Sequence, residues 1–127
     1  MTISVAVVGC GRWGSVHLAS LAEMKSSGQV DRVIACDVDE IALNNVIHAD
    51  ATYSSVEEMV GAEQPNLALI ATPNPTHYPL GMALLKNDLN LLIEKPFAPN
   101  PDAAATLIQE AINSGCTVSS GHLLRHH

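Results

Sequence analysis

Strand-like and helix-like segments alternate from one end of the chain to the other, and no other feature limits its fold as much. Residues 3–8 form a nearly continuous apolar run, as expected of a strand that is buried on both faces. Because such alternating units join through right-handed crossovers, the sequence predicts a mostly parallel, doubly wound α/β sheet with helices on both faces. The other strand-like runs lie near residues 32–36, 51–53, 66–71, 89–93 and 116–120.

Capping residues indicate where several helices begin. Asp39, Ser55 and Asn100 are of types that accept hydrogen bonds from the first turn of a helix, and Glu58 gives Ser55 the spacing of a capping box. The helix after Asp39 is expected to run through residues 41–46. The last helix has the clearest pattern, because apolar residues repeat at helical spacing along one face, at positions 104, 107, 108, 111 and 112.

Composition narrows the classes of protein that the chain can represent. Its 127 residues suffice for one domain, and 47% of them are hydrophobic. The net charge of −7 and the scattered Lys and Arg residues argue against a nucleic-acid partner. No apolar run is long enough to span a membrane, so we expect a cytoplasmic protein. Cys10, Cys36 and Cys116 form no C-x-x-C pair, and we expect buried thiols and no metal site.

The first predicted strand ends in the motif GCGRWG, which begins at Gly9 and opens a helix. A G-x-G-x-x-G loop in this context is typical of dinucleotide binding. Gly9 permits a tight turn, Gly11 lets the backbone approach the pyrophosphate, and Gly14 lets the helix pack closely on the strand. Free N–H groups at the helix start attract the phosphates. Trp13 belongs to the same cofactor-binding loop, whereas Arg12 either assists the pyrophosphate or lies on the surface.

Asp37 ends the second predicted strand, where an acid can accept hydrogen bonds from the adenine ribose. Its carboxylate would repel a 2′-phosphate, and no Arg or Lys follows it closely in sequence to neutralise one. NAD is therefore expected in preference to NADP, and Asp37→Ala is expected to narrow the difference. The alternative is a solvated acid at a strand end, since Val38 and Asp39 leave open which side chain faces the ribose.

Three further motifs complete the pattern: ATPNPTH at residues 71–77, EKP at 94–96 and GHLLR at 121–125. With the glycine loop and His17, they closely resemble the N-terminal domain of the glucose–fructose oxidoreductase, inositol 2-dehydrogenase and rhizopine catabolism family. The resemblance covers the whole chain. It implies a Rossmann domain followed by a larger α/β domain, and hydride transfer between NAD(P) and a secondary alcohol of a sugar, cyclitol or nucleotide sugar.

The resemblance also implies roles for residues in the loop after the fourth strand. Thr72, Pro73, Asn74 and His77 would line the cofactor. His77 is in addition a candidate catalytic residue, and the alternative is a histidine that fills space at the start of a helix.

The EKP motif carries the main catalytic candidate. By resemblance, Glu94 would lie near the nicotinamide ribose, and Lys95 would contact both that ribose and the substrate hydroxyl. The topology agrees, because Gly9, Asp37, Thr72 and Lys95 each follow a predicted strand and parallel strands end at one edge of the sheet. The alternative for Lys95 is a surface lysine beside a turn.

The Rossmann domain is expected to span residues 1–120, with residues 121–127 starting the connection to a substrate domain that is absent from this chain. In the family, that domain supplies the general acid/base and most of the substrate pocket. We therefore expect this chain by itself to bind NAD without oxidising sugars, and its uncovered apolar surface to favour a homo-oligomer. The alternative is a non-catalytic NAD-binding or sensing module, which would have no use for a lysine beside the nicotinamide.

Overall fold

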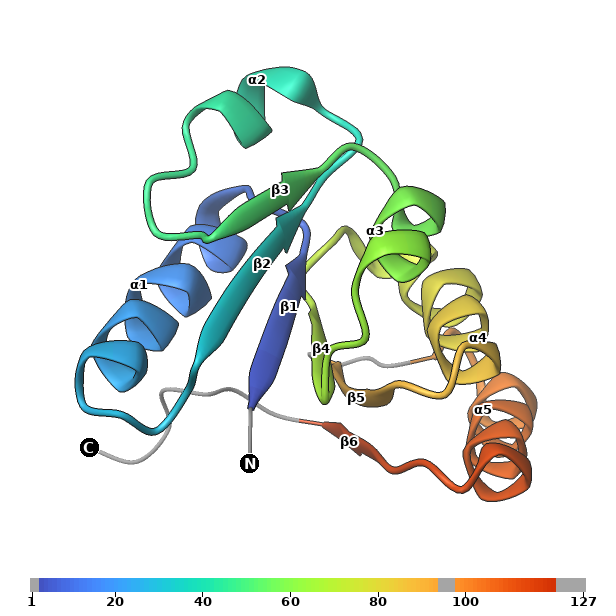
Figure 1. The fold of residues 1–127 in the computed structure, drawn as a ribbon. Helices are drawn as coiled ribbons and strands as arrows, with labels where there is room; N and C mark the ends of the chain where they lie inside the picture. The colour runs from blue at the N-terminus through green and yellow to red at the C-terminus, as the bar shows by residue number, and fades with distance from the viewer. Residues whose placement is uncertain (1–2, 94–97, 121–127) are drawn as a thin grey trace.

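The structure is a computed structural model that describes residues 3–93 and 98–120. Strands and helices alternate along this part of the chain, as the sequence predicts (Figure 1). The strands are β1 (Ser4–Val8), β2 (Arg32–Cys36), β3 (Ala51–Tyr53), β4 (Leu67–Ile70), β5 (Asn90–Ile93) and β6 (Val118–Ser120). The helices are α1 (Arg12–Ser26), α2 (Glu40–Asn44), α3 (Val56–Ala62), the short 3₁₀ helix η1 (Asn74–Thr76), α4 (His77–Lys86) and α5 (Pro101–Ser114).

The strands form one sheet in the order β3-β2-β1-β4-β5-β6, and every neighbouring pair is parallel. The central strands β1 and β4 are neighbours although β2 and β3 lie between them in sequence, so the strand order reverses at this point. All the carboxyl ends lie at the same edge of the sheet. The predicted doubly wound α/β fold is confirmed.

Helices cover both faces of the sheet, which explains why β1 is buried along its whole length (Figure 1). On one face, α3, α4 and α5 contribute Met59, Leu84 and Leu107 to an apolar cluster with the strands. On the other face, α1 contributes Leu18 and Leu21 to a second cluster. Within the described ranges, no helix combines the length and the apolar character that crossing a membrane requires.

The predicted helix caps are confirmed. Asp39, Ser55 and Asn100 each accept a hydrogen bond from a backbone N–H in the first turn of the helix that follows, at donor–acceptor distances of 2.9, 3.1 and 2.8 Å. The helix after Asp39 is shorter than predicted and ends at Asn44. The reason is a tightened last turn, in which the N–H groups of residues 45 and 46 bond to carbonyls three residues earlier.

The apolar face of α5 is only partly buried. Leu107 and Ala111 lie in the core, but Ile108 and Ile112 are 48% and 67% exposed. The five positions lie along one helical face, as predicted, but the core covers only part of that face. The helix packs chiefly along α4, so only the side of the apolar face that meets α4 is covered.

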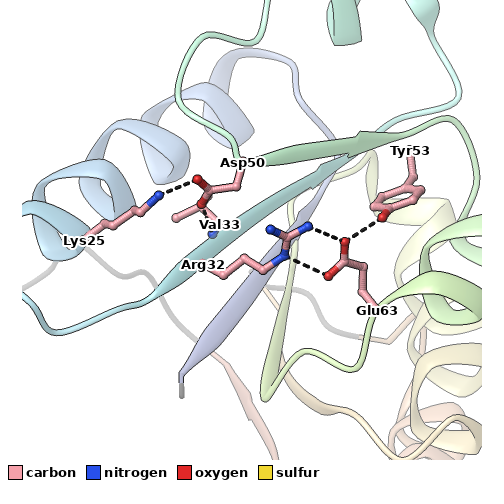
Figure 2. Close-up of polar contacts among 6 residues, drawn as sticks. All are labelled: Lys25, Arg32, Val33, Asp50, Tyr53 and Glu63. Atoms are coloured by element: carbon pink, nitrogen blue, oxygen red, sulfur yellow. Dashed lines mark hydrogen bonds and ion pairs between the residues drawn. The ribbon is translucent and has the colours of Figure 1, made fainter. Parts of the chain in front are cut away.

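Asp50 joins three elements near the amino-terminal edge of the sheet (Figure 2). Its carboxylate accepts a hydrogen bond from the Val33 N–H of β2 at 2.8 Å and forms an ion pair with Lys25 of α1. The bond from Lys25, and then the bond from Val33, hold the pKa of Asp50 below its usual value. These contacts fix β3, which lies at the end of the strand order in the described part of the chain, against β2.

A second polar network holds α3 in place (Figure 2). The Arg32 guanidinium donates to both carboxylate oxygens of Glu63, at 2.9 and 2.7 Å, in the bidentate geometry that Arg favours. The Tyr53 hydroxyl donates to the same carboxylate at 2.6 Å. Hydrogen bonding from Arg32 lowers the pKa of Glu63. The network anchors both ends of the segment that runs from β3 to the end of α3. The first turn of α3 lines a cavity at the carboxyl edge of the sheet.

Candidate functional site

A cavity of about 1120 Å³ opens at the carboxyl edge of the sheet, where the strand order reverses. The loops after β1, β2 and β4 line it, together with the first turns of α1, α3 and α4. Ligands of open α/β sheets bind at this place, because loops from neighbouring strands diverge there. Gly9, Asp37 and Thr72, which follow three different strands, are brought together in its lining, as the topology argument predicts.

The three glycines of the first loop have different surroundings. Gly9 has a φ of +101°, and a Cβ built on it would lie 2.7 Å from the Ala71 carbonyl oxygen. A Cβ on Gly14 would lie 1.7 Å from the Gly9 carbonyl oxygen. Both positions therefore need glycine for the close approach of backbone segments. A Cβ on Gly11 would meet nothing within 4 Å, although Gly11 lines the cavity.

The open side of Gly11 fits the pyrophosphate of a dinucleotide. Gly11 is the N-cap of α1, and the first turn of a helix has N–H groups with no carbonyl acceptor inside the helix. These groups and the helix dipole favour an anion. No steric conflict within the described residues requires a glycine at this position, whereas the approach of a bulky anion does.

Arg12 and Trp13 both line the cavity, which favours the ligand-facing interpretation of Arg12 over the surface one. The Arg12 guanidinium carbon lies 5.9 Å from the centre of the Trp13 ring, within the range of a cation–π contact. Trp13 is 52% exposed. Among residues 3–93 and 98–120, Arg12 is the one Lys or Arg that lines the cavity. Its positive charge suits a phosphate.

The Asp37 carboxylate lies beside the glycine loop. Its Oδ2 accepts a hydrogen bond from the Cys10 N–H at 2.7 Å, and its Oδ1 accepts one from the Asp39 N–H at 2.9 Å. A carboxylate has about four lone-pair positions, so acceptor capacity is left for ribose hydroxyls. Asp39 and Glu57 also line the cavity, so the described part of the lining has three carboxylates and one guanidinium.

The loop after β4 holds its shape through side chains. The Thr76 hydroxyl lies 2.6 Å from both the Thr72 hydroxyl and the Pro73 carbonyl oxygen. The Nε2 atom of His77 lies 2.8 Å from the Thr72 carbonyl oxygen. A carbonyl can only accept, so Nε2 carries the hydrogen. Asn74 also lines the cavity.

His77 is only 2% exposed, although it contributes to the lining. Its contact with Thr72 ties the first residue of α4 to the loop after β4. This geometry suits a residue that shapes the cofactor loop better than one that exchanges protons with a substrate.

The cysteines are not reactive groups of the site. Cys10 and Cys36 are buried, as predicted, and Cys116 is half-buried. Burial is the main reason why the pKa of Cys10 rises to about 11 and that of Cys36 to about 12. Thiols with such a pKa hold few thiolates at neutral pH. Across the described residues, no group of three or more His, Cys, Asp or Glu side chains could hold a metal ion.

Two of the predicted site residues are not described by the structure, and several residues that line the cavity were not predicted. Glu94 and Lys95 lie outside the described residues. Val38, Val56, Glu57 and Leu80 line the cavity and were not predicted. The sequence offers Val38 only as an alternative to Asp37, and the available signal is its place two residues after the end of β2.

Residues 3–122 match the sequence pattern of a family described as an oxidoreductase family with an NAD-binding Rossmann fold. The chain belongs to this family. The motifs at the glycine loop and after β4 had already indicated it by resemblance. The match confirms the predicted fold and establishes the domain as a member of an oxidoreductase family.

Individual relatives include several inositol dehydrogenases. The chain is 30% identical over 113 residues to an inositol 2-dehydrogenase of Renibacterium salmoninarum, covering 89% of this chain and 34% of that protein. It is 25% identical over 125 residues to the scyllo-inositol 2-dehydrogenase (NADP(+)) IolW of Bacillus subtilis, covering 95% of this chain and 33% of that protein. The chain thus spans about a third of the length of these relatives.

Solved structures share the fold. The WlbA dehydrogenase of Bordetella pertussis, in complex with NADH and UDP-GlcNAcA, superposes with a TM-score of 0.84 at 21% identity, over 95% of this chain and 37% of that one. GenD2 from gentamicin A biosynthesis, in complex with NAD, superposes with a TM-score of 0.81 at 28% identity, over 94% of this chain and 34% of that one.

Proposed function

We propose that this chain is the NAD-binding domain of an enzyme that transfers a hydride between NAD and a secondary alcohol of an inositol, sugar or nucleotide sugar. The observation that carries the proposal is the open side of Gly11, which faces a cavity that also contains the Asp37 carboxylate. The named activities of the inositol dehydrogenases support the class of substrate. The ligands of WlbA and GenD2 support the cofactor.

Each group of site residues has a distinct task in this proposal. The first turn of α1 and Arg12 hold the pyrophosphate, and Asp37 accepts hydrogen bonds from the adenine ribose. Thr72 and His77 shape the loop after β4, which would line the cofactor. When bound, NAD supplies the nicotinamide carbon that accepts or gives up the hydride.

NAD is expected to bind more tightly than NADP. Among the described residues, the cavity is lined by three carboxylates, those of Asp37, Asp39 and Glu57, and by one guanidinium, that of Arg12. The excess of negative charge would repel a 2′-phosphate. Calorimetric titration of the chain with NADH and NADPH should show at least a tenfold preference for NADH, about 1.4 kcal/mol. The existence of an NADP(+)-dependent relative makes the measurement informative. Equal affinities would contradict the ribose-facing role of Asp37.

Lys95 is proposed as the catalytic residue that donates a hydrogen bond to the reacting oxygen. This role rests on the EKP motif of the family. In the whole enzyme, Lys95→Ala should lower kcat by about 100-fold or more, while the Kd for NAD changes by less than about threefold. The difference arises because the reacting oxygen gains charge in the transition state, whereas the adenosine and pyrophosphate provide most of the cofactor affinity.

Lys86→Ala is a suitable control, because Lys86 ends α4 and does not line the cavity. Initial rates with a panel of inositols, hexoses and nucleotide sugars, together with NADH titration, separate the two effects. Near-normal turnover of the Lys95→Ala enzyme would mean that Lys95 has a structural role only.

A further inference from the structure

We propose that Asp37 is a positioning residue of the glycine loop: through the Cys10 N–H, the carboxylate sets the shape of the loop that holds the pyrophosphate. The inference rests on the proposed function and deepens it. The usual expectation for an acid at this place concerns the ribose alone. The geometry assigns it a second task, which is to hold the backbone of the glycine loop.

The contact is well placed to control the loop. Cys10 lies between Gly9 and Gly11, so its N–H is the amide directly before the residue that faces the pyrophosphate. That N–H donates to Asp37 Oδ2 at 2.7 Å, a short bond of the kind that a charged acceptor makes. The contact is partly buried, so water is a poor substitute for the carboxylate.

The neighbouring bonds show what the carboxylate adds. The Gly9 N–H already donates to the Cys36 carbonyl oxygen at 2.8 Å, which fixes the end of β1 to the end of β2. The Asp37 bond extends this attachment by one residue into the loop, where the pairing of β1 with β2 has ended. Asp37 is itself fixed, because its N–H donates to the Tyr53 carbonyl oxygen at 3.1 Å.

Two subsites of the cofactor therefore share one side chain. With two backbone donors on its two oxygens, the carboxylate keeps about two lone-pair positions for ribose hydroxyls. A substitution intended only to admit a 2′-phosphate would then also loosen the pyrophosphate loop. The affinity for NADPH should depend on whether the new side chain can still accept the Cys10 N–H.

The test compares Asp37→Ala with Asp37→Asn. Alanine removes the acceptor, whereas asparagine removes the charge and keeps one carbonyl oxygen that can accept from the Cys10 N–H. Its amide nitrogen then takes the place of the oxygen that accepts from the Asp39 N–H, so that bond is lost in both variants. In Asp37→Ala, we expect the Cys10 amide to exchange with solvent roughly tenfold faster in the cofactor-free chain, measured by NMR. Asp37→Asn should restore most of the protection.

Calorimetry with NADH and NADPH gives the second readout. Asp37→Asn should bind NADPH about tenfold more tightly than Asp37→Ala does, since both lack the charge and only one keeps the loop bond. Asp39→Ala is the matched control: its carboxylate lines the cavity but bonds to Ile41 of α2, so Cys10 exchange should stay at the wild-type rate.

The readouts separate this inference from the proposed function. If Asp37→Ala leaves Cys10 exchange unchanged, or binds NADPH as tightly as Asp37→Asn does, the positioning role is wrong. Absence of NADH binding by the wild-type chain would reject the proposed function, while the exchange rates would still decide the role of Asp37. Asp37→Ser, whose hydroxyl is too short to replace the carboxylate, takes the place of Asp37→Ala if the alanine variant does not fold.

Discussion

Gly11→Val is expected to reduce the affinity for NADH by at least about 100-fold while the domain keeps its fold. The valine side chain would project from a loop that lines the cavity, at a position where no described residue except its chain neighbours lies within 4 Å. The pyrophosphate would then lose its contact with the first turn of α1. Gly11 has a φ of −75°, so the position needs no left-handed conformation.

Stability measurements distinguish this result from unfolding. Valine is a weaker N-cap than glycine, so the free energy of unfolding should fall by no more than about 1 kcal/mol. Gly61→Val provides the matched control, since a Cβ at Gly61 in α3 also meets nothing within 4 Å and Gly61 lies outside the cavity. It should bind NADH normally. Normal binding by Gly11→Val would mean that the cofactor does not approach this loop.

The fold could largely be predicted because its signals are local and repeated. The buried run at β1, the cap residues and the alternation of elements each depend on neighbouring residues in sequence. The extent of burial could not be predicted in this way, because it depends on tertiary packing. Ile108 and Ile112 follow the same helical period as Leu107, but α5 leans on α4 and leaves them in solvent. Periodicity gives the direction of a side chain and not the extent of the surface that covers it.

The candidate site was predictable in its position and less so in its details. Parallel topology was sufficient to bring Gly9, Asp37 and Thr72 to one cavity. The bond between Asp37 and the Cys10 N–H joins residues 27 positions apart, and no spacing rule predicts it. The burial of His77 against the Thr72 carbonyl likewise depends on how the loop after β4 closes. Glu57 lies in the first turn of α3 and lines the cavity, and no motif in the sequence indicated this.

Gly14→Ala is expected to destabilise the fold strongly, whereas Gly11→Val is expected to weaken NADH binding and leave the fold intact. The added Cβ would lie 1.7 Å from the Gly9 carbonyl oxygen, far inside van der Waals contact. Relief requires a backbone shift, and Gly9 cannot shift freely. Its N–H is bonded to the Cys36 carbonyl oxygen at 2.8 Å, and its other side faces the Ala71 carbonyl.

Chemical denaturation should therefore show a loss of about 3 kcal/mol or more in the free energy of unfolding, at the upper end of overpacking costs. Gly61→Ala is the control for adding a methyl group to a helical glycine. It should leave stability unchanged or raise it by up to about 1 kcal/mol, because alanine favours the helix. A Gly14→Ala domain as stable as the wild type would mean that α1 does not begin so close to β1. The assignment of separate roles, with Gly14 required for the packing of α1 and Gly11 for the ligand, would then be wrong.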